Sequence, residues 1–155
     1  MNIRLAGEND IDFLIRMRWD FTLEHDTSGK IKEEDYDSFY EECKTFLVNA
    51  MRGSSNWFIW VAEHESQIVS NIFIELVNKV PRPGRITYPF AYMTNVYTVP
   101  EYRGKGIGSA LIREINEWAE EQKYEFIIVW PSDEAIPFYE RNGYKHCNEP
   151  MEKMF

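Results

Sequence analysis

Residues that commonly build disulfide, metal or membrane features are scarce in this chain. Cys43 and Cys147 are its only cysteines among 155 residues, too few for a disulfide framework and consistent with a reducing compartment. The histidines His25, His64 and His146 lie far apart without ligand spacing, so we expect no metal site. No apolar run is long enough to cross a membrane, and the N-terminal residues lack the apolar core of a secretory signal. We therefore predict a cytoplasmic protein without a membrane partner.

Basic residues are also scarce relative to acidic ones. The chain has 17 Lys and Arg against 26 Asp and Glu, a formal net charge of -9. Binding to nucleic acid needs a basic surface that displaces counterions, so no nucleic-acid partner is expected. The acidic excess is compatible with a cationic substrate and equally with a role in solubility alone. An anionic ligand would have to be held by local positive groups within an unfavourable overall field.

The apolar content is sufficient for a folded domain. Hydrophobic residues make up 44% of the chain and aromatic residues 15%, which excludes a disordered protein. A chain of this length buries roughly two thirds of its unfolded surface. No linker, repeat or low-complexity segment divides it. We therefore predict a single domain over residues 1–155.

Hydrophobic periodicity predicts both strands and helices. Apolar residues recur three and four apart from Tyr36 to Met51, and two β-rich runs are joined by the polar turn His64 to Ser66. The four expected helices cover Ile11–Leu23, Tyr36–Met51, Gly108–Gln122 and Ala135–Asn142. The expected strands cover Asn2–Ala6, Trp57–Glu63, Gln67–Val77, Tyr88–Val99 and Phe126–Trp130, with one or two more between Tyr144 and Phe155. This order predicts an α/β domain with a mixed sheet.

A glycine-rich loop separates the expected fourth strand from the helix that follows. It reads V-P-E-Y-R-G-K-G-I-G-S from Val99 to Ser109. Gly104, Gly106 and Gly108 remove Cβ atoms where a ligand could approach the backbone, and the first amides of the helix are free to face an anion. The loop therefore predicts a pyrophosphate cradle, with a ligand-free glycine turn as the alternative.

Two common phosphate-binding loops do not fit these residues. A Walker A loop needs four residues between its first glycine and a Gly-Lys-Ser/Thr sequence, a spacing that is absent from the chain. A G-x-G-x-x-G fingerprint would need glycine where Ser109 stands. Arg103, Gly106 and Gly108 instead match R-x-x-G-x-G, which resembles the acetyl-CoA loop of the GNAT acetyltransferase superfamily.

A second segment strengthens this resemblance. Ala135, Phe138, Tyr139, Gly143 and Tyr144 match A-x-x-F-Y-x-x-x-G-[FY], a signature of the same superfamily. The specific match covers residues 91–144, and only the coarse pattern of elements extends over the N-terminal half. The resemblance implies a mostly antiparallel sheet of six to seven strands that opens between its fourth and fifth strands to admit acetyl-CoA. A homodimer through exposed final strands remains open.

The resemblance also implies a reaction and a set of residues. An acetyl group would pass directly from acetyl-CoA to a primary amine, on a small molecule or a protein, within a ternary complex. Tyr139 would donate to the leaving thiolate, and the Val99 amide would polarise the thioester oxygen. The implied cofactor-binding residues are Tyr97, Thr98, Val99, Arg103, Gly104, Lys105, Gly106, Ile107, Gly108, Ser109, Ser132 and Phe138. Ser132 stands where the family often has Asn.

The group that deprotonates the amine has no clear signal in the sequence. Many family members carry Glu on the fourth strand, whereas residues 91–99 include no acidic residue. We expect ordered water to carry the proton, with Glu75 or an acidic residue of Glu24–Asp37 as other candidates. The missing carboxylate also keeps open a non-catalytic acyl-CoA-binding or regulatory module. The sequence leaves the size of the acyl group undefined.

Overall fold

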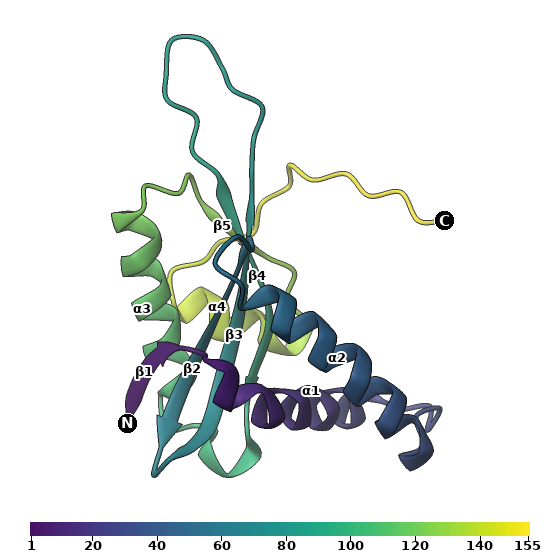
Figure 1. Ribbon diagram of the computed structural model, residues 1–155. Coiled ribbons are helices and arrows are strands. Elements are labelled where there is room, and N and C mark those ends of the chain that lie inside the picture. The colour runs from purple at the N-terminus through teal and green to yellow at the C-terminus, as the bar shows by residue number, and fades with distance from the viewer.

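The computed structural model describes residues 1–155 and contains a five-stranded sheet with helices on both faces (Figure 1). The strands are β1 (Asn2–Leu5), β2 (Trp57–His64), β3 (Gln67–Val77), β4 (Phe90–Thr98) and β5 (Ile127–Val129). They lie in this order across the sheet, and each neighbouring pair is antiparallel except β4 and β5, which are parallel. The predicted α/β class with a mixed, mostly antiparallel sheet is confirmed.

The predicted number of strands is wrong. Residues 142–155 contain no strand, so the sheet has five strands and not six or seven. Every residue from Lys145 to Phe155 is exposed, and Pro150 has no N–H group to give to a ladder. The segment therefore has no buried face that would fix it against β5. Figure 1 shows the chain passing the end of the sheet and its last residues leading away from it.

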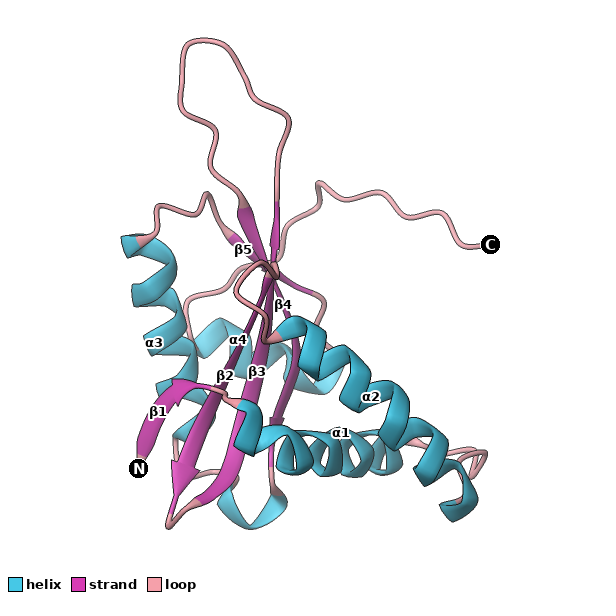
Figure 2. Cartoon of the chain, in the orientation of Figure 1, coloured by secondary structure: helices cyan, strands magenta, loops and turns pink.

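Four α-helices cover the sheet. They are α1 (Ile11–His25), α2 (Tyr36–Ala50), α3 (Ile107–Glu121) and α4 (Ile136–Arg141). All four predicted helices are present, and their ends lie within two residues of the predicted ones. Helices α1 and α2 lie on one face, and α3 lies on the other (Figure 2). None of the helices combines the length and the apolar composition that a membrane crossing requires.

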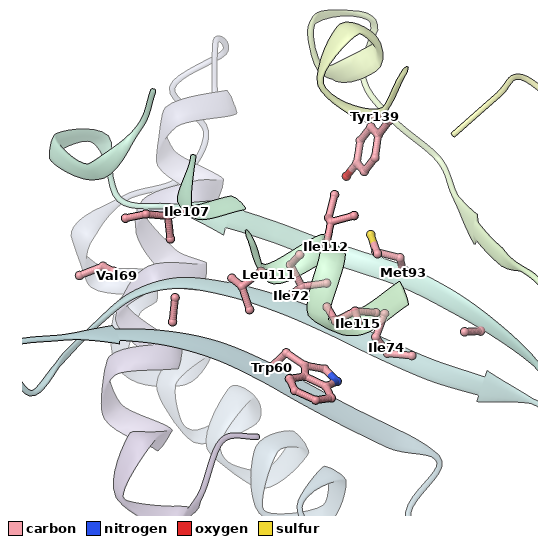
Figure 3. Packing of buried hydrophobic residues seen from close by; sticks show 12 residues of the cluster. Trp60, Val69, Ile72, Ile74, Met93, Ile107, Leu111, Ile112, Ile115 and Tyr139 are labelled. Atoms are coloured by element: carbon pink, nitrogen blue, oxygen red, sulfur yellow. The ribbon is translucent and has the colours of Figure 1, made fainter. Parts of the chain in front are cut away.

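Helix α3 packs through the apolar stripe that its periodicity predicts. Leu111, Ile112 and Ile115 are at most 1% exposed and belong to one cluster with Ile72 and Ile74 of β3 (Figure 3). A second cluster on the opposite face includes Leu14, Ile15, Leu47, Val61 and Phe73. Because β3 contributes to both clusters, the centre of the sheet is held between two packed layers.

Strand β5 ends early and leaves part of β4 without a neighbour. Only Ala91–Met93 of β4 pair with Ile127–Val129 of β5. Pro131 follows β5 after one residue, and proline cannot donate to a ladder. The edge of β4 over residues 94–98 is therefore open on the side away from β3.

Replacing Leu111 by Ala tests the packing of α3. The side chain is fully buried, so the variant loses apolar burial and leaves a cavity, and we expect its free energy of unfolding to fall by about 2–5 kcal/mol. Urea denaturation measures the change. Arg113→Ala is the control on the exposed face of the same helix, with an expected change within about 0.5 kcal/mol. Equal losses in the two variants would contradict the assignment of the buried face.

Candidate active site

The glycine-rich loop presents a row of free backbone amides. Gly104 and Gly106 have φ angles of 73° and 79°, which glycine adopts without a steric penalty, and Gly106 is the N-cap of α3. The amides from Gly104 to Ser109 have no acceptor within the chain, and the first helical bond runs from the Ala110 amide to the Gly106 carbonyl. The first turn of α3 carries no acidic residue. This end of α3 therefore fits an anion such as a pyrophosphate.

Gly108 serves packing more than ligand access. A Cβ at this position would lie 3.2 Å from the Phe138 ring, so the absent side chain lets α4 approach the start of α3. The Asn142 side-chain nitrogen also donates to the Ser109 hydroxyl at 3.2 Å. The sequence predicts an open position for ligand at all three glycines, whereas the structure gives Gly108 a neighbour from α4. The two segments that resemble the acetyltransferase superfamily are thus in direct contact.

The side chain of Arg103 is already paired. Its Nη2 donates to both oxygens of Glu24 at 3.0 and 2.7 Å, and its Nε donates to the Thr98 carbonyl at 2.8 Å. The sequence predicts Arg103 as a charge partner for pyrophosphate, but this guanidinium instead ties the loop to α1 and β4. Lys105 has no carboxylate partner and lies over the Tyr102 ring, 5.0 Å from its centroid. Lys105 is therefore the cation that remains available at the cradle.

Glu24 joins three elements that are far apart in the sequence. Besides Arg103, it accepts a hydrogen bond of 2.6 Å from the hydroxyl of Tyr97 on β4. Burial acts to raise the pKa of Glu24, but the hydrogen bonds from Tyr97 and Arg103 and the charge of Arg103 outweigh it and lower the pKa. Burial and the neighbouring carboxylate raise the pKa of Tyr97. The sequence offers no spacing signal for this contact, because its partners come from separate segments.

Tyr139 combines burial with an unpaired hydroxyl. The residue is 6% exposed and points from α4 toward the layer that contains Ile112 (Figure 3). Burial raises the pKa of Tyr139 to about 12. The Tyr139 hydroxyl makes no hydrogen bond within the chain. It is not among the fully enclosed polar atoms that lack a partner, which are Trp60 Nε1 and Asn71 Oδ1. The hydroxyl therefore stays protonated at neutral pH, and it is not fully enclosed.

The resemblance implies that the Val99 backbone amide is free to polarise a thioester, but in the structure this amide is already bonded. The Val99 amide donates to the Val69 carbonyl at 3.0 Å, so it faces β3 and is not free to polarise a thioester. The Tyr97 carbonyl also faces β3, where it accepts from the Ser70 hydroxyl at 3.0 Å. Because backbone groups alternate along a strand, the amides of Val96 and Thr98 point toward the open edge. In the structure these two amides, and not that of Val99, therefore face the open edge.

Other predicted residues lie at the borders of this region. Ser132 follows β5 and precedes α4, and its side chain makes no capping hydrogen bond. Glu75 lies on β3 opposite Tyr92 of β4 and is half-buried. A cavity of about 720 Å³ lies between β5, α4 and residues 144–150, and Tyr139 forms part of its wall. No three His, Cys, Asp or Glu side chains gather in a group that could hold a metal ion.

Comparison with known proteins assigns these features to one family. Residues 55–146 match the family described as Acetyltransferase (GNAT) domain. The glucosamine 6-phosphate N-acetyltransferase of Trypanosoma brucei brucei is 30% identical over 85 residues, which are 55% of this chain and 56% of that protein. The match to this curated relative thus spans about half of its length.

Two solved structures share the fold along nearly the whole chain. A predicted acetyltransferase from Clostridium acetobutylicum, solved with acetyl-CoA, is 24% identical with a TM-score of 0.75, covering 99% of this chain and 95% of the other. A glucosamine-6-phosphate N-acetyltransferase from Arabidopsis thaliana is 21% identical with a TM-score of 0.67, covering 99% and 97%. The family match extends over more than half of the chain and includes the cradle, β4 and α4. The chain therefore belongs to the GNAT acetyltransferase family.

Proposed function

We propose that this protein is an N-acetyltransferase that moves an acetyl group from acetyl-CoA directly to a primary amine. The observation that carries the proposal is the row of unpaired amides from Gly104 to Ser109 beside the open edge of β4. Such a row has no structural use within the chain, and it matches the chemistry of a pyrophosphate. The family membership supplies the type of reaction.

The cofactor would bind through groups that are free in the structure. Acetyl-CoA supplies the acetyl group as a thioester, which an amine attacks as the CoA thiolate leaves. The amides of Gly104 to Ser109 and the Lys105 ammonium hold the pyrophosphate, and the Phe138 ring borders its site at Gly108. Ser132 stays a proposed cofactor contact on the resemblance alone. The amides of Val96 and Thr98 bind the pantetheine arm and stabilise the charge that develops on the thioester oxygen.

Tyr139 acts on the leaving thiolate. A thiol has an ordinary pKa of about 8.5, whereas burial raises the pKa of Tyr139 to about 12. Full proton transfer from this phenol is therefore unfavourable by more than about three pKa units. Tyr139 contributes mainly as a hydrogen-bond donor that stabilises the departing sulfur, and water completes the protonation.

The acceptor is a primary amine, and we propose an amino sugar phosphate as the first class to test. The support is the name of the matched relative from Trypanosoma brucei brucei, a glucosamine 6-phosphate N-acetyltransferase. Strand β4 carries no carboxylate, so ordered water removes the proton of the ammonium group, with Glu75 on the neighbouring strand as the nearest alternative in the sheet.

The binding step gives a first test. A ligand that binds only the folded state at a hundred times its Kd adds about 2.7 kcal/mol to the free energy of unfolding. We expect millimolar acetyl-CoA to raise the melting temperature by several degrees. An amine that carries no phosphate group, added without acetyl-CoA, should leave the melting temperature unchanged. Absence of a shift with acetyl-CoA would exclude the proposed cofactor.

Replacing Tyr139 by Phe tests the catalytic step. The hydroxyl has no partner in the chain, so stability and the acetyl-CoA melting shift are expected to persist, while kcat falls by about a hundredfold. Release of free CoA thiol with glucosamine 6-phosphate and a panel of other amines measures kcat. Tyr144→Phe is the matched control, because its hydroxyl donates to Asn116 at 2.9 Å and lies outside the proposed chemistry. If neither wild type nor variant releases thiol with any amine, the protein is a binding module.

Replacing Glu24 by Gln tests the contact that ties the cradle loop to α1. A lowered carboxyl pKa stabilises the fold above the unfolded pKa of about 4.3, and this stabilisation is lost as the pH falls through the folded value. We expect the variant to be less stable than wild type at pH 7, with the difference narrowing below about pH 4. Urea denaturation across this range measures it. Glu114→Gln, on the exposed face of α3, is the control for the loss of one carboxylate.

A further inference from the structure

The alternation of backbone amides between the two edges of β4 is shifted by one residue in the middle of the strand. The Ala91 amide donates to the Phe126 carbonyl on the β5 side, whereas the Val99 amide donates to the Val69 carbonyl on the β3 side. These residues are an even number of positions apart, so in a regular strand both amides would point to the same edge. An extra residue between them must therefore shift the alternation.

The extra residue lies at Asn95. Opposite it, the register passes from Phe73 and Thr94 directly to Asn71 and Tyr97, so two residues of β4 face one residue of β3. Asn95 has a φ angle of 49°, in the left-handed region that is unfavourable for a residue with a side chain. Because of this β-bulge, Val96 and Thr98 direct their amides to the open edge, whereas Tyr97 and Val99 face β3.

Two side chains from other elements hold Asn95 in place. Asn71 on β3 donates from its side-chain nitrogen to the Asn95 backbone carbonyl, at 2.6 Å. Arg18 on α1 donates to the Asn95 side-chain oxygen, at 3.1 Å. Asn71 is 1% exposed, and its Oδ1 is enclosed without a partner. Burying an amide side chain with an unpaired oxygen lowers the stability of a core. The one side-chain hydrogen bond of Asn71 is the bond to the bulge residue Asn95.

We propose that Asn71 is a positioning residue for acetyl transfer, acting by clamping the Asn95 bulge so that the Val96 and Thr98 amides face the thioester. Arg18 is the second, exposed clamp. The inference rests on the proposed function for its catalytic consequence, but the effect on the bulge is independent of it. Asn71 itself touches neither cofactor nor acceptor, because its side chain is enclosed on the β3 strand.

Replacing Asn71 by Leu keeps the approximate shape and removes the clamp. We expect kcat to fall at least tenfold, whereas the acetyl-CoA melting shift persists because the amides of Gly104 to Ser109 are unchanged. Arg18→Ala, at an exposed position that does not threaten folding, should lower kcat severalfold. Trp60→Phe is the matched control, since it removes the other enclosed unpaired polar atom from a strand outside the site and should leave kcat unchanged.

Hydrogen exchange of individual β4 backbone amides measures the effect of the bulge independently of enzymatic activity. In the wild type, the Tyr97 and Val99 amides should be protected and those of Val96 and Thr98 should exchange quickly; in Asn71→Leu this alternation should be lost. Retention of the alternation, or retention of kcat, overturns the proposal. Should Asn71→Leu fail to fold, Arg18→Ala decides by the same two measurements. If wild type shows no turnover, the proposed function fails, while the exchange pattern still determines whether Asn71 sets the bulge.

Discussion

The site depends on backbone groups that the fold leaves without partners. Buried amides are almost always paired, and an unpaired one is costly unless water or a ligand reaches it. Here the early end of β5 exposes one edge of β4, and the left-handed glycines Gly104 and Gly106 turn the following amides outward. Both groups of amides lie where β4 passes into α3. One chain segment thereby presents both groups of free amides, which are the donors that we propose for a pyrophosphate and a thioester oxygen.

Local dipoles, and not net charge, explain how an acidic protein can accept an anionic cofactor. The chain carries a formal charge of -9, and the Arg103 guanidinium is paired with Glu24. What remains at the cradle is the positive end of α3, the free amides and Lys105. These act over a few ångströms, within the Debye length of about 8 Å at physiological ionic strength, so the distant carboxylates are largely screened. The ion pair with Glu24 serves a different purpose, because it fixes the loop against α1 and β4.

The polar side chains around the site divide into those that are free to meet a ligand and those that shape the backbone. Tyr139 has a free hydroxyl and belongs to the first group. Glu24, Arg103 and Asn71 bond to groups of the chain itself: Glu24 to Arg103 and Tyr97, Arg103 also to the Thr98 carbonyl, and the Asn71 side-chain nitrogen to the Asn95 carbonyl. These contacts hold β4 and its loop in one conformation. Removing a member of the second group would change the direction of backbone donors without removing any donor. In the proposed reaction, side chains that touch no ligand would thus still affect the rate.

The sequence alone determined the local elements and the type of site. Spacing at three and four residues located α2 and α3, the turn at His64 located the β2 and β3 hairpin, and R-x-x-G-x-G with Tyr139 indicated acetyl-CoA chemistry. These signals are readable because they arise among near neighbours in the chain. Tertiary structure decided the rest: the pairing of Arg103 with Glu24, the contact of Gly108 with Phe138, the outward amides of Val96 and Thr98, and the absence of strands after Arg141. Each of these depends on which distant segment lies alongside, and hydrogen bonds and packing between such segments leave no periodic trace in the sequence.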